Sequence, residues 1–407
     1  MNTDNLIIYE NIQQLLTMEG VVKKQGRHVQ AEDLGVIENA SVVADADTSL
    51  IVWVGKTNEL PKEFESVINR FSSVGEVWLP ELVECHTHLI YAGSRHHDYG
   101  LRCQGKSYLQ VAAEGGGILS TLKHTRAASS RELEESAIHD VDLFQKFGVG
   151  TIEIKSGYGL SLESEIKILE CIKNLSEKTN VHLISTFLPA HATPPEFKGR
   201  TDEYVDVICR EWIPEIAKRN LALFFDAFIE EGYFSVPQTK KLCETALAAG
   251  LKLKLHADQF NALGGTELGV DLGAVSIDHL DNASDSAVKK LANSNTVAVL
   301  CPGASLFTGT PYPPARKILD QGGVVAISTD YNPGTCPSRN LPLMTTLACS
   351  QMKMAVPEAI AAVTYNAARA LSLENEVGAL LAGRPFRACQ LKADSYELLP
   401  YSFGELT

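Results

Sequence analysis

The chain has 407 residues, with 36 Lys and Arg against 50 Asp and Glu, which gives a formal net charge of −14. Hydrophobic residues make up 45% and charged residues 21%, values that fit a globular protein and exclude a disordered or fibrous one. Nucleic acids and anionic membranes attract basic surfaces, so we expect neither as a partner. The length suits one barrel-sized domain with a smaller appended domain.

The cysteine content and the first residues bear on the cellular compartment. The nine cysteines form no CxxC pair, and an odd number spread over a long chain argues against a disulfide framework. The start, MNTDNLIIYENIQQLL, lacks a basic segment followed by a long apolar one, so we expect no secretory signal. No run approaches the roughly 18 apolar residues of a spanning helix. A cytoplasmic location is the expectation.

In chain order, the first predicted unit is a small β domain. The apolar runs LIIY and SLIVWVG are separated by the turn-forming stretches ADADTS and GKTNELP, which predicts short strands within residues 1–76. Residues 373–407 are expected to return to this domain and complete a small β sandwich.

Between these segments, residues 77–372 alternate apolar strands with stretches of helical spacing such as SLESEIKILECIKNL and VPQTKKLCETALAAG. This alternation is typical of parallel βα units, and eight units close a (β/α)8, or TIM, barrel. The expected strands are EVWLPELVECHTH, VGTIEIKSGYG, VHLISTFLPAHA, LALFFDAFIEEG, LKLKLHADQF, AVSIDHL, TVAVLCPGAS and VVAISTDYNPG.

Polar side chains follow most of these strands, at the barrel face where active sites form. Six of the eleven histidines lie at or just after strand ends: His86, His88, His191, His256, His279 and one of His96 and His97. Any one of them, taken alone, is as well explained as a core or surface histidine. Their convergence from separate strands favours a site.

The strongest pattern is His86-Thr87-His88 at the end of the first barrel strand. Side chains alternate along a strand, so both imidazoles face the barrel axis. A lone HxH motif is weak evidence, but together with His256 on strand five and Asp330 on strand eight it predicts a metal site suited to zinc or iron. The alternative role for Asp330 is a helix N-cap.

Such a metal lowers the pKa of a bound water, so hydrolysis is the predicted reaction class. Asp330 would serve as ligand and proton acceptor. His279, on strand six, could hold the hydroxide or donate to a developing oxyanion.

The motifs ELVECHTHLIYAGSR, EIKSGYGL, FLPAHATPPEF, LKLHADQF, SIDHL and STDYNPGT resemble those of the imidazolonepropionases of the amidohydrolase superfamily, over most of the chain. The resemblance implies one divalent ion, zinc or iron, held by His86, His88, His256 and Asp330. It also implies a small-molecule substrate, 4-imidazolone-5-propanoate, opened by water to N-formimidoyl-L-glutamate in histidine degradation. A homodimer is the expected assembly.

The implied substrate carries a propionate. Because the protein is acidic overall, binding this carboxylate requires a positively charged side chain in the site, and an arginine can form two parallel hydrogen bonds with it. Arg95, which follows the His86-Thr87-His88 motif closely, fits this need, although a surface salt bridge is its alternative role. The resemblance implies further substrate contacts from Tyr158, His191, Asn332, Gly334 and Thr335. The glycine and threonine of NPGT would let backbone N–H groups and a hydroxyl approach an anion.

Three more features receive roles outside the metal site. Lys155, after strand two, is expected to be a structural ion-pair partner rather than a carboxylated metal ligand. The glycine run EGGGI at 114–118 could form a lid and does not match a phosphate loop. Cys85 is expected to be a small buried residue.

Two rival interpretations are a deaminase or other cyclic amidohydrolase on the same barrel, and a catalytically inactive relative that acts as a binding protein. Deaminases of this group resemble HxxE on strand five, whereas this chain has His256-Ala257-Asp258-Gln259. Gln259 cannot carry a proton, so it keeps a hydrogen-bonding role in substrate binding and catalysis, and any base role moves to His279 or Asp330. The intact set of ligands argues against an inactive relative.

Overall fold

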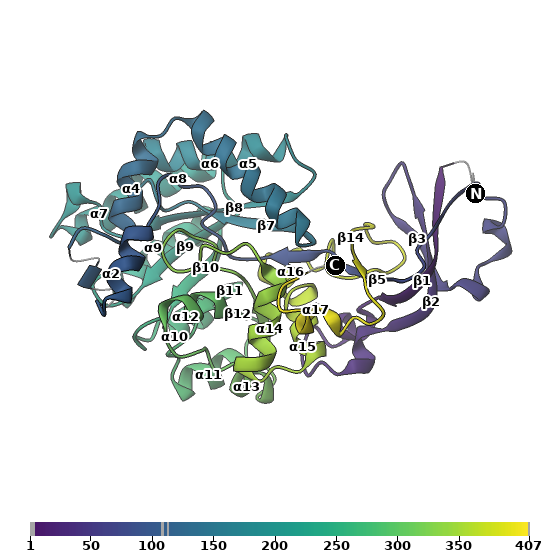
Figure 1. Cartoon of the computed structure of the whole chain (residues 1–407). Helices are drawn as coiled ribbons and strands as arrows, with labels where there is room; N and C mark the ends of the chain where they lie inside the picture. Colours follow the sequence, from purple (N-terminus) through teal and green to yellow (C-terminus); the bar gives the residue numbers. More distant parts are fainter. Residues whose placement is uncertain (1–4, 107–109, 112–113, 406–407) are drawn as a thin grey trace.

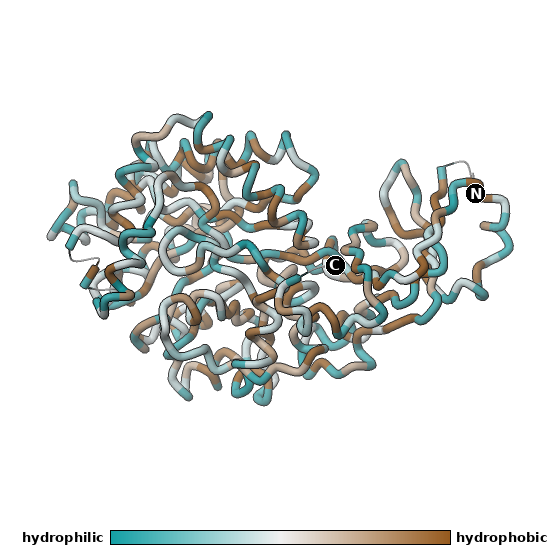
Figure 2. Tube along the Cα trace, in the orientation of Figure 1, coloured by the Kyte–Doolittle hydropathy of each residue, from teal (hydrophilic) through white to brown (hydrophobic). Residues whose placement is uncertain are grey.

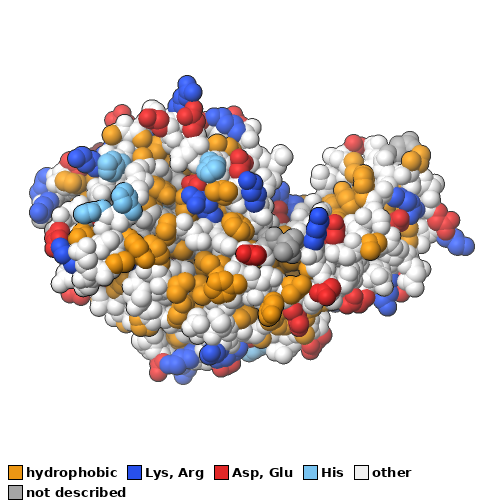
Figure 3. Space-filling model, viewed as in Figure 1, with side chains coloured by type: hydrophobic (Ala, Val, Ile, Leu, Met, Phe, Trp, Pro, Cys, Tyr) orange, Lys and Arg blue, Asp and Glu red, His pale blue; other side chains and the backbone are white. Residues whose placement is uncertain are grey.

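The computed structural model describes residues 5–106, 110–111 and 114–405. Figure 1 shows a large barrel with a smaller β domain at its side, next to the N-terminus. Among the described residues, none of the helices combines the length and apolar character needed to cross a bilayer. Figure 3 shows acidic and basic side chains interspersed over the visible face.

The barrel sheet has eight strands in sequential order, as expected from the alternating pattern. Every neighbouring pair in this order is parallel. The circle closes through a parallel bridge between Thr87 and Tyr331, with the His88 N–H donating to the Tyr331 carbonyl at 2.8 Å. The strands are β6 (Leu82–Glu84), β7 (Val149–Lys155), β8 (His182–Ala190), β9 (Phe224–Ile229), β10 (Lys252–Ala257), β11 (Ser276–His279), β12 (Val297–Leu300) and β13 (Val324–Ile327).

One predicted strand is divided differently. EVWLPELVECHTH holds two strands, because β5 (Glu76–Pro80) pairs with β1 (Leu6–Leu16) and β14 (Ala388–Lys392) in the small sheet, and only β6 belongs to the barrel. A single residue, Glu81, separates the two, so the apolar run reads as one strand in the sequence. The domain boundaries at residues 76 and 372 remain predictions. Residues 77–80, however, lie in the small sheet rather than in the barrel.

Helices cover the outside of the barrel, and Figure 2 shows brown and teal alternating along them. In α5 (Ser130–Lys146), the buried residues Leu133, Ala137, Val141 and Phe144 recur every three to four positions, so one helix face packs on the strands. Its start is fixed by Ser129, which accepts from the Glu132 N–H in a capping box.

The expected helices SLESEIKILECIKNL and VPQTKKLCETALAAG are present as α6 (Leu162–Ser176) and α9 (Val236–Ala248). The helices around the barrel are α2 (His96–Cys103), α4 (Ile118–Ala127), α5 (Ser130–Lys146), α6 (Leu162–Ser176), α7 (Thr201–Val207), α8 (Ile213–Arg219), α9 (Val236–Ala248), α10 (Gly265–Asp271), α11 (Asp285–Ala292), α12 (Pro302–Thr308), α13 (Ala315–Asp320), α14 (Leu341–Met352), α15 (Val356–Ala362) and α16 (Tyr365–Ala370). Short helices are α1 (Glu19–Lys23), α17 (Leu398–Tyr401) and the one-turn segments Ala31–Leu34, Thr57–Glu59, Lys62–Phe64, Pro195–Phe197 and Ile208–Trp212.

The small domain is built on one six-stranded mixed sheet, where we expected a sandwich. Val42 and Val43, adjacent on β2, lie in different hydrophobic clusters, so both faces of the sheet are covered. The C-terminal strand β14 pairs antiparallel with β5, which joins the two ends of the chain. The strands are β1 (Leu6–Leu16), β2 (Val36–Asp45), β3 (Ile51–Lys56), β4 (Asn69–Ser72), β5 (Glu76–Pro80) and β14 (Ala388–Lys392).

Candidate metal centre

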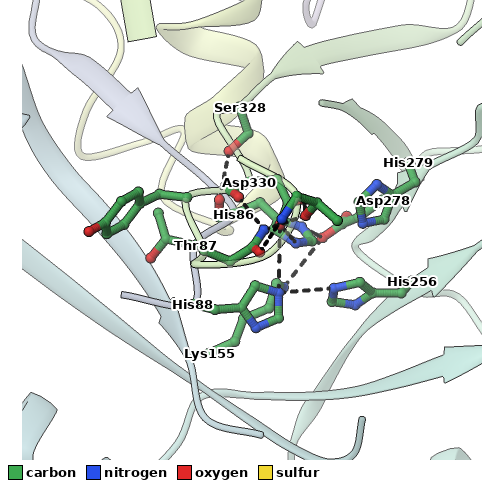
Figure 4. A network of polar contacts seen from close by, with 12 residues as sticks. His86, Thr87, His88, Lys155, His256, Asp278, His279, Ser328 and Asp330 are labelled. Carbon is green, nitrogen blue, oxygen red and sulfur yellow. Dashed lines mark hydrogen bonds and ion pairs between the residues drawn. The ribbon is translucent and has the colours of Figure 1, made fainter. Parts of the chain in front are cut away.

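The four predicted ligands lie together at the C-terminal end of the barrel strands. Figure 4 shows His86, His88, His256 and Asp330 pointing toward one another. The Nε2 atoms of His88 and His256 are 3.3 Å apart. Oδ1 of Asp330 lies 3.4 Å from Nε2 of His86 and 3.7 Å from Nε2 of His88. All four residues are buried.

These spacings fit a shared divalent ion. Two ligand atoms at about 2.1 Å from a tetrahedral zinc ion stand roughly 3.4 Å apart, which is close to the observed separations. Nε2 of His86 is buried and has no hydrogen-bond partner in the described part of the chain. A buried polar atom normally has a partner, and a metal ion would be a suitable one for this nitrogen. The residues present therefore fit the metal that the sequence implies.

The protonation states of the ligands agree with this assignment. Burial lowers the pKa of His86 and of His88 well below the usual value, so both imidazoles are neutral and keep a lone pair for a metal. Burial also raises the pKa of Asp330 to about 7. A cation at this point compensates the cost of burying the ionised carboxylate.

Two carboxylates turn ligand nitrogens toward the site. Oδ2 of Asp278 lies 2.6 Å from Nδ1 of His86, and Oδ2 of Asp226 lies 2.9 Å from Nδ1 of His256. An imidazole that gives its Nδ1–H to a carboxylate presents Nε2 to the metal, and such carboxylates also raise the basicity of the ligand.

A buried lysine holds both carboxylates. Nζ of Lys155 is 2.9 Å from Oδ2 of Asp226, 3.3 Å from Oδ2 of Asp278 and 2.9 Å from Oε1 of Glu153. Burial alone would lower the pKa of Lys155, but the three carboxylates hold it well above its usual value. This confirms the structural ion-pair role expected from the sequence and places Lys155 behind the ligands.

A small pocket lies beside the candidate ligands. Its lining is His88, Arg95, Ile118, Tyr158, His191, Phe228, His256, Gln259, Phe260, His279, Asp330, Asn332 and Thr335. Every site residue expected from the sequence lines this pocket except His86, which lies in the ligand cluster 3.4 Å from Asp330, and Gly334.

Two further histidines, His191 and His279, line the pocket. Nδ1 of His191 lies 3.0 Å from the carbonyl oxygen of Gly157, so it carries the proton and Nε2 faces away from that contact. Burial lowers the pKa of His191 and of His279 to about 3. His279 and Asp330 both have left-handed backbone, with φ of 82° and 55°, an uncommon conformation that concentrates at functional sites.

The loop after β13 is arranged differently from the expectation. The N–H groups of Gly334 and Thr335 donate to Oδ1 of Asn332 at 2.7 and 2.8 Å, so they are engaged within the loop rather than directed at an anion. Gly334 instead packs against Arg95, since an added Cβ would lie 2.0 Å from Nη1 of that arginine. The Thr335 hydroxyl donates to Oδ2 of Asp330 at 3.0 Å and supports a ligand.

Sequence reasoning assigned no role to Asp226, Asp278 or Asp98, which orient His256, His86 and Arg95. A weak signal was available, because Asp226 is a lone charge in the apolar strand LALFFDAF and must have a partner if it is buried. Asp278 directly precedes His279 in SIDHL but faces a histidine 192 positions away.

Comparison with known proteins agrees with this geometry. The model of the amidohydrolase family matches residues 233–395. The chain is 45% identical over 401 residues to the imidazolonepropionase of Bdellovibrio bacteriovorus, with 98% of this chain and 93% of the relative covered. The imidazolonepropionase of Alkaliphilus oremlandii is 41% identical, with 99% and 95% covered. This chain belongs to the imidazolonepropionase family.

Solved structures of other amidohydrolases share the fold. The 5-methylcytosine deaminase of Klebsiella pneumoniae liganded with 5-fluorocytosine has a TM-score of 0.72 at 14% identity, with 98% of this chain and 97% of that chain covered. A zinc-bound adenosine deaminase from Xanthomonas campestris has a TM-score of 0.66 at 14% identity, with 95% and 84% covered. At this identity the likeness establishes the fold alone, which is the TIM barrel expected from the sequence.

Proposed function

We propose that this imidazolonepropionase family member hydrolyses the cyclic amide of 4-imidazolone-5-propanoate to N-formimidoyl-L-glutamate, a step of histidine degradation. The observation that carries the proposal is the convergence of His86, His88, His256 and Asp330 beside a pocket that also holds Arg95. The family relatives of the same name, matched over nearly the whole chain, support the substrate.

The reaction adds one water across the ring C–N bond. The hydroxyl goes to the carbonyl carbon, the C–N bond breaks, and a proton goes to the ring nitrogen. One divalent ion, zinc or iron, held by the four ligands would supply Lewis acidity and lower the pKa of a water molecule. Both metals accept imidazole and carboxylate ligands.

Side chains of the pocket carry out the proton transfer and the hydrogen bonding. Asp330, with a pKa raised to about 7, is placed to accept a proton from water and return it to the leaving nitrogen. His279 lines the same pocket in its neutral form, and we assign it the hydrogen bond to the oxygen that gains negative charge. Gln259, with no titratable proton, serves as a hydrogen-bonding group to the ring.

Recognition of the substrate involves the remaining lining residues. Arg95 is the cationic side chain of the lining and pairs with the propionate. We assign ring and side-chain contacts to Tyr158, His191, Asn332 and Thr335, which lie around it. Gly334 contributes by leaving room for the guanidinium.

Deamination is the second reaction that this barrel could support, since deaminases are among the solved structures that share the fold. Gln259 argues against it, because the leaving amine would lack the acidic group that HxxE provides. The two reactions are separable in one assay: ring opening yields formimidoylglutamate, and deamination yields ammonia. Release of ammonia without ring opening would overturn the proposed function.

We also infer a cytoplasmic homodimer. The nine cysteines are unpaired in the structure, as in a reducing compartment, and closed two-fold dimers are the commonest assembly of globular enzymes. Light scattering of the purified protein at several concentrations tests the assembly, and a mass of one chain at all concentrations would contradict it.

A further inference from the structure

Three separate chain segments meet at the side chain of Arg95. Oδ2 of Asp98, in the first turn of α2, accepts from Nε of Arg95 at 2.9 Å. The same oxygen accepts from the backbone N–H of Gly117 at 2.9 Å. Arg95 and Asp98 are both buried, with 5% and 8% of their surface exposed, so this contact is shielded from solvent.

The glycine run needs its small residues in order to reach Asp98. Gly117 has φ of 72° and ψ of −153°, a conformation that side-chain-bearing residues rarely adopt. A Cβ on Gly116 would stand 2.8 Å from Oδ1 of Asp98. The next residue, Ile118, lines the pocket, so the run is connected both to the arginine and to the site.

The loop after β13 bounds the opposite side of the guanidinium. A Cβ on Gly334 would lie 2.0 Å from Nη1 and 2.4 Å from Cζ of Arg95. Nη2 of Arg102, also on α2, donates to the Gly334 carbonyl at 3.3 Å. Arg95 is therefore confined between a carboxylate on one side and a glycine backbone on the other.

We propose that Asp98 is a positioning residue that fixes the Arg95 guanidinium, ties it to the glycine run at 114–117, and thereby sets the preference for ligands that carry a carboxylate. The role rests on the proposed function for its natural substrate. An acidic residue in a first helical turn also interacts favourably with the helix dipole, so the test must separate positioning from helix stability.

The experiment compares Asp98→Asn with Glu81→Gln in metal-loaded protein. Glu81 is a matched control, because it is also a buried carboxylate that pairs with an arginine: its Oε2 accepts from Nε of Arg387 at 2.6 Å. Glu81 lies between β5 and β6, at the opposite end of the barrel strands from the pocket. Calorimetry measures the binding of imidazole-4-propionate, which cannot be hydrolysed, and of imidazole, which lacks the carboxylate. Thermal unfolding is recorded for each variant.

Asp98→Asn is expected to weaken imidazole-4-propionate binding about tenfold, as for loss of a charge-assisted contact, and to leave imidazole binding within twofold. In the ring-opening assay it should raise KM about tenfold with little change in kcat. Glu81→Gln should change stability only. If Asp98→Asn does not fold, Gly117→Ala disturbs the same contact from the glycine run and should give the same selective loss.

Equal loss of imidazole and imidazole-4-propionate binding, or unchanged binding of both in a folded variant, would overturn the positioning role. Failure of the wild-type protein to open the ring would refute the proposed function instead, and the calorimetric comparison would still decide the role of Asp98.

Discussion

The substitution Gly334→Ala tests how tightly Arg95 must be placed. The added methyl carbon would lie 2.0 Å from Nη1, 2.4 Å from Cζ and 3.0 Å from Nη2 of Arg95. An unstrained contact is about 3.5 Å, so the guanidinium must move by roughly 1.5 Å. Gly334 does not have positive φ, so the methyl group acts by steric contact and not by backbone strain.

A displacement of about 1 Å of a substrate-positioning group costs roughly 100-fold in rate. We therefore expect kcat/KM to fall by about 100-fold, which is about 2.7 kcal/mol of lost transition-state stabilisation. Metal content should not change, because Gly334 makes no contact with His86, His88 or His256 that the structure records in the described residues.

The assay follows loss of the imidazolone absorbance at several substrate concentrations, with metal content measured on the same samples. Gly100→Ala is the control, because Gly100 lies on α2, close to Arg95 in the chain, and a Cβ there would meet nothing within 4 Å. It should keep activity and stabilise the helix by about 0.5–1 kcal/mol. A folded, metal-replete Gly334→Ala protein with kcat/KM within threefold of wild type would refute this reasoning.

Three further predictions concern the groups around the metal. Asp278→Asn should weaken metal affinity about 10- to 100-fold in a chelator competition, because His86 loses its carboxylate partner; unchanged affinity would contradict the orienting role. Lys155→Met leaves three buried carboxylates without their shared cation, so urea unfolding should show a loss of about 3–5 kcal/mol, and a loss below 1 kcal/mol would contradict it. A cation binds ionised Asp330, whose pKa is about 7, so the protonated fraction grows as pH falls. Metal affinity measured by titration should then drop about tenfold per pH unit below 7 and level off above it; a flat profile would contradict the raised pKa of Asp330 in the metal-free protein.

The sequence was sufficient for the barrel and for the residues that face its open end. Period-two strands and helical spacing are local patterns, and the four candidate ligands follow strand ends, where barrel enzymes place reactive side chains. The single continuous strand predicted from residue 76 onward was wrong, because β5 and β6 are equally apolar and only their pairing partners distinguish them. Pairing over hundreds of residues is not a local property.

Groups that act through other residues were harder to predict. Asp98 lies three residues from Arg95, a spacing that fits any exposed helical ion pair, and its contact with Gly117 comes from a separate segment. In the NPGT loop, the sequence suggested N–H groups directed at an anion. In the structure, Oδ1 of Asn332 accepts hydrogen bonds from those N–H groups, because the short side chain of asparagine can reach the backbone of the turn that follows it.

The central claim is metal-dependent opening of the imidazolone ring. Its most direct test is the ultraviolet absorbance of freshly prepared 4-imidazolone-5-propanoate after addition of metal-replete protein, beside a chelator-treated sample and that sample reloaded with zinc or iron. We expect loss of the ring absorbance with formation of N-formimidoyl-L-glutamate, abolished by the chelator and restored by metal. Stable absorbance in a metal-replete sample would contradict it.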